Sequence, residues 1–240
     1  MPVCLIQKRG RRGSCLPKKT RAILFDLDGT LLDSTNLILE CFKHSWETVC
    51  GFNHQREVLL ETFGTPLREA MRRLLSLSNG HLSGNPDDTI VDQLLMEYRT
   101  YNTAHHDLLA RPFDGTAEVL TELRRRQYSI GLVTSKGREL GLRGLQLCSL
   151  DHLIDSAVFL EDTGVHKPNP EPILAALEKL SESCESAVYV GDSRHDIVAA
   201  RAAGVSSVAA LWGPASRLEL ESERPDFMAE SISDLLDIFD

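Results

Sequence analysis

Two acidic residues separated by one position, Asp26 and Asp28, directly follow a short apolar run, residues 22–25, and precede Gly29. The apolar run has the length and flanks of a buried β-strand. Residues two apart on an extended strand point to the same side, so both carboxylates are expected to face one region. Two unpaired carboxylates there are costly unless a cation or phosphate chemistry uses them. Taken alone, the segment therefore fits either a metal- or phosphate-linked site at the end of a strand or an acidic turn that caps the strand.

A second acidic pair follows another apolar run much later in the chain. Asp192 comes after residues 187–190 and Gly191, and Asp196 lies four positions further on. This spacing places Asp192 at a strand end and Asp196 where a helix begins. Carboxylate oxygens suit a hard divalent cation such as Mg²⁺. Taken alone, the motif also fits a structural Gly-Asp turn with Asp196 facing water.

Three further residues could contact a phosphate group. Thr134 and Ser135 follow the apolar run 129–133, and a hydroxyl beside a Gly-rich turn can donate to phosphate oxygens. Lys167 could neutralise phosphate charge and keep a nucleophilic carboxylate ionised. Each signal is weak by itself, because a strand-terminal Thr is usually structural and most lysines are solvated.

The four patterns occur in a fixed order, each near the carboxyl end of an expected strand, where open α/β sheets place their ligands. In this order, beginning with Asp-x-Asp-Gly-Thr at 26–30, they resemble the motifs of the haloacid dehalogenase superfamily. Most of its members are magnesium-dependent phosphohydrolases. The resemblance covers the chain from about residue 22 onward. It implies an α/β fold with a doubly wound, mostly parallel sheet and a helical cap inserted after the first strand.

The same resemblance implies roles for the motif residues. Asp26 is expected to attack phosphorus and form an aspartyl-phosphate, and Asp28 to act as general acid and then general base. Phosphate contacts are expected from Thr134, Ser135 and Lys167. The implied cofactor is Mg²⁺, held by Asp26, by Asp28 through its backbone carbonyl, by Asp192 and by Asp196.

Residues 35–109 read as an insertion made of helices. Apolar periodicity predicts helices at 36–49, 56–63, 67–77 and 89–105, with a Gly- and Pro-containing loop at 79–88. The segment resembles the cap of the phosphoglycolate phosphatase branch, and residues 63–68 resemble its substrate-facing loop. In this interpretation Gly64 allows close approach, Thr65 offers a hydroxyl and Arg68 binds an anionic substrate end. The other interpretation makes Thr65 the N-cap of a helix with Pro66 at its first position.

The substrate stays open at this stage. Residues 98–102, 105–107 and 33–36 are similar to a branch that hydrolyses inorganic pyrophosphate. The leading hypothesis is a phosphatase acting on a small phosphorylated metabolite, with pyrophosphatase or sugar phosphomutase as alternatives. Phosphonate cleavage is less favoured, because Lys43 is the single lysine between residues 35 and 109. A non-catalytic binding protein is disfavoured, because no motif residue is missing.

Composition and charge narrow the classes further. The 240 residues carry a formal net charge of -9, which argues against general nucleic-acid binding. Residues 1–21 are basic and acid-free, and we expect them to be a disordered head, a transit peptide being less favoured. We expect the α/β core at 22–34 and 110–240. The six cysteines do not have the spacing of a disulfide framework, and no apolar run reaches the roughly 18 residues that a membrane span needs. We therefore expect a cytoplasmic protein that does not bind membranes, as a monomer or a homodimer.

Overall fold

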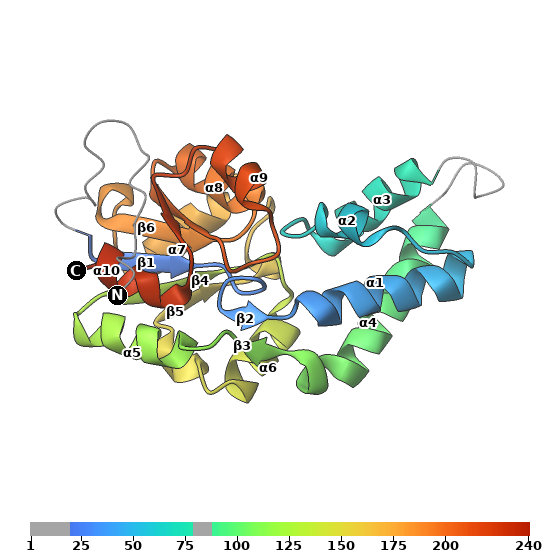
Figure 1. The fold of residues 1–240 in the computed structure, drawn as a ribbon, viewed down its shortest axis with the longest axis horizontal. Coiled ribbons are helices and arrows are strands. Elements are labelled where there is room, and N and C mark those ends of the chain that lie inside the picture. Colours follow the sequence, from blue (N-terminus) through green and yellow to red (C-terminus); the bar gives the residue numbers. More distant parts are fainter. Residues whose placement is uncertain (1–19, 79–87) are drawn as a thin grey trace, which may run out of the picture.

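The computed structural model describes residues 20–78 and 88–240, in which a sheet with helices on both faces lies beside a unit made of helices (Figure 1). The expected disordered head lies outside the described residues except for Thr20 and Arg21. No helix in the described part of the chain combines the length and the apolar character needed to cross a membrane.

The main sheet is fully parallel and has the strand order β5-β4-β1-β6-β7-β8. Its strands are β1 (Ala22–Phe25), β4 (Ser129–Val133), β5 (Ser156–Val158), β6 (Ala187–Gly191), β7 (Ser206–Ala210) and β8 (Phe227–Ala229). β1 is central, and Phe25 at its end lies opposite Leu132 of β4 and Val190 of β6. The three apolar runs expected to be strands before Asp26, Thr134 and Asp192 therefore end side by side.

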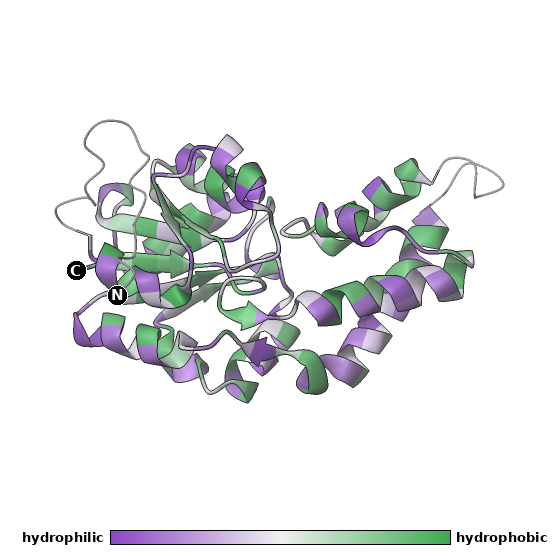
Figure 2. Cartoon of the chain, in the orientation of Figure 1, coloured by the Kyte–Doolittle hydropathy of each residue, from purple (hydrophilic) through white to green (hydrophobic). Residues whose placement is uncertain are grey.

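Alternate residues of β1 supply two hydrophobic cores, one on each face of the sheet. Ile23 and Phe25 belong to the core covered by α5 (Thr116–Arg125), α6 (Arg138–Leu147) and α10 (Leu235–Ile238). Ala22 and Leu24 belong to the core under α7 (Glu171–Leu180) and α8 (Arg194–Ala203). A strand buried on both faces must be apolar throughout, which explains the continuous apolar run. The apolar colour of the sheet in Figure 2 shows the same pattern.

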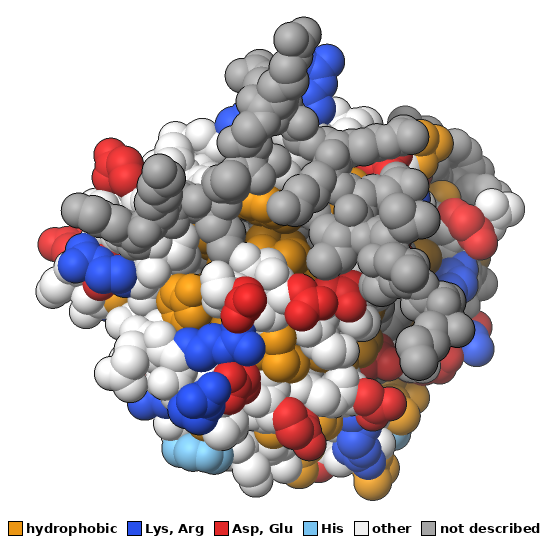
Figure 3. Space-filling model, turned by 60° about the vertical axis from the view of Figure 1, so that its left-hand side comes forward, with side chains coloured by type: hydrophobic (Ala, Val, Ile, Leu, Met, Phe, Trp, Pro, Cys, Tyr) orange, Lys and Arg blue, Asp and Glu red, His pale blue; other side chains and the backbone are white. Residues whose placement is uncertain are grey.

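The remaining elements of the core are short. They are α9 (Arg217–Ser222) and the 3₁₀ turns η1 (Asp151–Leu153), η2 (Leu160–Asp162), η3 (Cys184–Ser186) and η4 (Ile232–Asp234). On the face shown in Figure 3, Lys and Arg side chains of the described residues lie among Asp and Glu side chains and form no continuous basic surface.

Residues 35–109, here called the helical unit, have a hydrophobic core of their own that includes Trp46, Met71, Leu74 and Leu94. The unit contains α1 (Thr35–Cys50), α2 (Arg56–Leu60), α3 (Leu67–Leu77) and α4 (Asp88–Leu109). Two short strands, β2 (Leu32–Asp33) and β3 (Arg111–Pro112), pair antiparallel where the chain leaves and re-enters the α/β core. The composition of residues 111–115, with Pro112 and Gly115, predicts a return linker at the second of these positions, and the short strand pairing was not expected.

The parallel sheet with surrounding helices confirms the expected α/β fold class. The interpretation of Thr65 as a helix N-cap is wrong. Pro66 is the N-cap of α3, with an extended backbone (φ -54°, ψ 135°), and no side chain caps the helix. Because Pro66 is extended, the helix begins one residue later than that interpretation required, at Leu67.

Candidate active site

Asp26 lies at the carboxyl end of the central strand and is almost fully buried (5% exposed). Its backbone N–H donates to the carbonyl of Val190, so the sheet fixes the position of Asp26. The ammonium of Lys167 lies 2.9 Å from its Oδ1. Burial and, to a smaller extent, the neighbouring Asp196 raise the pKa of Asp26 to about 7, because together they outweigh the lowering effect of Lys167.

Lys167 joins the strand ends into one charged network. Its Nζ donates to Asp196 Oδ1 at 2.7 Å, to the hydroxyl of Tyr189 at 3.1 Å and to the carbonyl of Val133 at 3.3 Å. Burial opposes the charge of Lys167, but the attraction of Asp196 and Asp26 outweighs it and raises the lysine pKa. The lysine is therefore held as a cation against Asp26 without contact with bulk water.

Three acidic residues are clustered at this edge of the sheet: Asp26, Asp192 and Asp196 each have a carboxylate oxygen within 4.8 Å of the others. Thr30 Oγ1 donates to Asp192 Oδ1 at 2.8 Å and orients that carboxylate. Burial and the neighbouring carboxylates Asp196 and Asp26 raise the pKa of Asp192 well above its ordinary value. One lysine does not balance three buried carboxylates, and a hard divalent cation would relieve the repulsion. The donor set therefore fits such an ion.

Asp196 has less freedom to bind an ion directly. Lys167 occupies its Oδ1, and its Oδ2 accepts from Ser193 N at 2.9 Å and Ser193 Oγ at 2.6 Å. Burial raises the pKa of Asp196, but Lys167 and Ser193 outweigh that effect and lower it. The Asp196 carboxylate is therefore placed to orient the neighbouring charged groups rather than to bind an ion itself.

Asp28 has different surroundings from Asp26. Its Oδ1 accepts from Ser34 Oγ at 2.6 Å and from Lys136 Nζ at 2.7 Å, and its side chain is not part of the acidic cluster. Sequence reasoning missed Lys136 and Ser34 as site residues. Their positions next to predicted site segments were the available signal, since Lys136 follows Ser135 directly and Ser34 lies just after the first motif.

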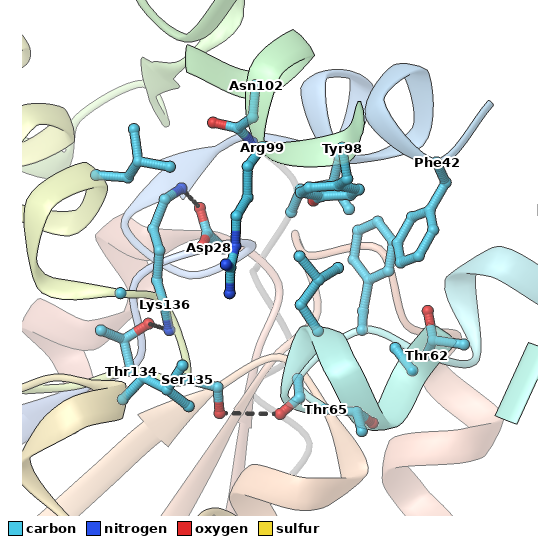
Figure 4. Close-up of a pocket in the computed structure, with 18 of the residues that line it drawn as sticks. Asp28, Phe42, Thr62, Thr65, Tyr98, Arg99, Asn102, Thr134, Ser135 and Lys136 are labelled. Atoms are coloured by element: carbon cyan, nitrogen blue, oxygen red, sulfur yellow. Dashed lines mark hydrogen bonds and ion pairs between the residues drawn. The ribbon is translucent and has the colours of Figure 1, made fainter. Parts of the chain in front are cut away.

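A cavity of about 510 Å³ lies between the helical unit and the α/β core (Figure 4). The core contributes polar lining residues, among them Asp26, Asp28, Thr134, Ser135 and Lys136. The helical unit contributes a more apolar wall with Ile38, Phe42, Phe63, Leu67 and Tyr98, together with Gly64 and the polar residues Thr65, Arg99 and Asn102. The reacting edge of the sheet therefore opens into a space that both parts of the protein enclose.

The loop before α3 touches the core directly. Ser135 Oγ donates to the carbonyl of Gly64 at 3.1 Å. Gly64 has φ +79°, and a Cβ added there would lie 2.7 Å from Ser193 Oγ. Gly64 and Thr65 both line the cavity, whereas Arg68 does not and pairs with Asp92 instead.

A doubly wound sheet that presents a buried carboxylate, a lysine and an acidic cluster at its carboxyl edge defines an enzyme of the phosphoryl-transfer type. The chain belongs to the haloacid dehalogenase-like hydrolase family, whose model matches residues 23–210. It is a phosphatase of that family, as the four motifs predicted.

Curated relatives are similar over nearly the whole chain. A protein named pyrophosphatase PpaX from Bacillus cereus is 36% identical over 220 residues, covering 92% of this chain and 96% of the relative. The PpaX of Bacillus anthracis has the same identity and coverage.

Solved structures show the same fold. A predicted phosphoglycolate phosphatase from Haemophilus somnus superimposes with a TM-score of 0.85 at 21% identity, covering 92% of this chain and 99% of that one. A haloacid dehalogenase-like hydrolase from Bacteroides fragilis gives a TM-score of 0.80 at 28% identity, covering 90% of this chain and 100% of the other.

Proposed function

We propose that this protein is a Mg²⁺-dependent phosphatase that hydrolyses a small phosphorylated metabolite through an aspartyl-phosphate on Asp26. The observation that carries the proposal is the buried network in which Lys167 bridges Asp26 and Asp196 at the inner end of the cavity. A carboxylate held against a lysine at that position is arranged to attack an electrophile that arrives from the cavity.

The proposed reaction has two steps on the same residues. A carboxylate oxygen of Asp26 forms a bond to phosphorus while the bond to the leaving oxygen breaks, and Asp28 gives that oxygen a proton. Water then attacks phosphorus, Asp28 takes its proton, and the bond from Asp26 to phosphorus breaks to release phosphate. Lys167 and Thr134 hold the phosphoryl oxygens as their charge redistributes.

The environment of Asp28 suits its part in this reaction. Ser34 and Lys136 both contact Oδ1, and no described residue is hydrogen-bonded to Oδ2. The second oxygen is therefore the one that would exchange a proton with the leaving group. Lys136 and Ser34 would keep it aimed at the cavity.

The cation would be held by Asp26 and Asp192, with Asp196 orienting the cluster, and Asp28 could add its backbone carbonyl. Mg²⁺ at such a site withdraws charge from the phosphoryl oxygens and lowers the repulsion between the phosphate and the attacking carboxylate. The helical unit would act as the cap that closes over substrate and excludes water.

Inorganic pyrophosphate is a second candidate substrate. The curated relatives at 36% identity carry the name pyrophosphatase. The stretch that resembles that branch in sequence, residues 98–102, also supplies three lining residues of the cavity, Tyr98, Arg99 and Asn102. The hydrolysis of an anhydride would use the same nucleophile and the same acid.

The test is phosphate release from a panel of phosphometabolites and pyrophosphate, with Mg²⁺ or with a chelator. Wild-type protein should release phosphate only with Mg²⁺, and Asp26→Asn should lose at least about 10³-fold in kcat. The matched control is Asp114→Asn, which removes an exposed carboxylate in the linker after β3. Wild-type activity in a folded Asp26→Asn variant would refute the assignment of the nucleophile.

A further inference from the structure

Two cationic side chains line the cavity, and they differ in how their charge is used. Lys136 is paired with Asp28 at 2.7 Å. Arg99, on α4, has no ion-pair or hydrogen-bond partner within residues 20–78 and 88–240, although it lines the same cavity. Figure 4 shows its side chain extending from α4 into the cavity that Asp28 also lines.

Other arginines of the helical unit show the contrast. Arg68, Arg72 and Arg73 are paired with Asp92, Asp88 and Glu61 respectively, on the exposed surface. Arg99 is itself solvent-exposed, but it lines the partly apolar cavity without an acidic partner among the described residues, so its five donors are available to a group that enters the cavity. The guanidinium group matches the geometry of carboxylate and phosphate groups.

A second polar residue lies one turn further along the same helix. Asn102 lines the cavity, is almost fully buried, and its Oδ1 has no hydrogen-bond partner among the described residues. A buried acceptor without a partner is destabilising, so packing alone does not account for an amide at this position. Arg99 and Asn102 therefore form a polar strip on the α4 side of the cavity, where Tyr98 and Thr103 also line it.

The position of Arg99 indicates which part of a substrate it meets. In the proposed reaction the leaving oxygen lies on the far side of phosphorus from Asp26, since attack and departure are in line. Asp28 must reach that oxygen to protonate it. Arg99 lines the cavity from the helical unit, opposite the strand ends, and Asp28 lines the same cavity, whereas Lys167 contacts Asp26 and is not a lining residue, so Arg99 is placed to meet the leaving group.

We infer that Arg99 binds a second anionic group, a carboxylate or a phosphate, carried by the leaving group of the substrate. The inference rests on the proposed phosphatase function and narrows its substrate class to phosphates with a nearby second anion. Phosphoglycolate and pyrophosphate both meet this requirement, and simple alkyl phosphates do not. The sequence assigned the binding of an anionic substrate end to Arg68 on α3. In this inference Arg99 on α4, which lines the cavity, has that role instead.

The experiment compares substrates that differ in the second anion. Phosphoglycolate and ethyl phosphate share a two-carbon leaving group and differ in the carboxylate, and pyrophosphate supplies a phosphate instead. With Mg²⁺, Arg99→Met should lower kcat/KM about 10- to 100-fold for phosphoglycolate, for pyrophosphate or for both, the range expected for one charged hydrogen-bonding contact. It should change kcat/KM for ethyl phosphate by no more than about twofold, and Arg99→Lys should fall between wild type and Arg99→Met.

The matched control is Arg72→Met, which removes an arginine of the same unit that is paired with Asp88 on the surface. All substrates should be used by this variant as by wild type. Equal losses on ethyl phosphate and on the dianionic substrates in Arg99→Met would overturn the inference while leaving the phosphatase function intact. A wild-type preference for ethyl phosphate over both phosphoglycolate and pyrophosphate would overturn it as well.

Binding without turnover separates this inference from the proposed function. In an Asp26→Asn background, calorimetry should show tighter binding of phosphoglycolate than of ethyl phosphate, and adding Arg99→Met should remove the difference. Absence of phosphate release by wild-type protein from every substrate would refute the proposed function, and the calorimetric comparison would still decide the role of Arg99.

Discussion

Replacing Lys167 by methionine should both destabilise the protein and make its stability strongly dependent on pH. The lysine is 3% exposed and is the charge partner of two buried carboxylates, Asp26 at 2.9 Å and Asp196 at 2.7 Å. Removing one partner of a buried ion pair costs about 3–5 kcal/mol. At about 2–4 °C per kcal/mol for a chain of this size, the melting temperature should fall by about 6–20 °C.

The sign of the pH dependence follows from Asp26. Its pKa is already raised to about 7 with Lys167 in place, so the folded protein binds a proton that the unfolded chain releases near pH 4. The folded protein therefore loses stability as pH rises from the unfolded pKa of this carboxyl toward its folded pKa. Without the lysine that pKa rises further. The loss in free energy of unfolding relative to wild type should therefore be smaller at pH 6 than at pH 8, and it should grow by up to about 1.4 kcal/mol per pH unit.

Thermal unfolding of the metal-free protein at pH 6, 7 and 8 measures both effects. The control is Lys179→Met, which removes a half-exposed lysine paired with Asp162 and should cost about 0–1 kcal/mol at every pH. If Lys167→Met melted within 2 °C of the control, or with the same deficit at all three pH values, the buried network would not have the charges assigned to it.

Two further predictions concern the cation and the loop before α3. Protons compete with Mg²⁺ for Asp26, because the pKa of Asp26 is raised to about 7. The apparent Kd of Mg²⁺, measured from thermal shifts, should therefore be about tenfold larger at pH 6 than at pH 8. A Kd that does not change with pH would remove Asp26 from the set of ligands. Gly64→Ala should lower kcat/KM, because the added Cβ would lie 2.7 Å from Ser193 Oγ. The control is Gly51→Ala, at a glycine with φ +74° and no atom within 4 Å of an added Cβ. This control should lose about 1–2 kcal/mol of stability and keep the wild-type kcat/KM. Unchanged kcat/KM in both variants would show that the loop contact does not support activity.

The sequence predicted the α/β core and its strand-end residues because their signals are local. An apolar run followed by a polar residue and glycine marks the end of a buried strand, and Asp26, Thr134 and Asp192 each follow such a run. Parallel strands then bring those ends together regardless of the loops between them. The structure places Lys167 at the same point, although it lies nine positions after Val158 at the end of β5, and there the prediction depended on the family resemblance.

The residues of the cavity wall could not be predicted in the same way. Lys136 and its partner Asp28 are 108 positions apart, and their contact depends on how the turn after β4 meets the turn after β1. Arg68 and Arg99 both lie on helices of the helical unit, and the rotation of each helix decides which one faces the cavity. That rotation is set by packing within the unit's own core, where Met71 and Leu74 of α3 meet Leu94 of α4. Single-helix periodicity does not contain this information.

The two carboxylates of the first motif are given different environments by a single turn. The strand ends at Phe25, so the rule that residues two apart face one side no longer holds at Asp28. Gly29 turns the chain with φ +87°, and a Cβ there would overlap the carboxylate of Asp192, so the turn is available to glycine alone. Both residues line the cavity, but Asp26 remains in the buried cluster with Lys167, whereas Asp28 is half-buried and pairs with Lys136. The two acids to which we assign different roles in the proposed reaction, Asp26 as nucleophile and Asp28 as proton donor, thus differ in burial and charge partners although one residue separates them.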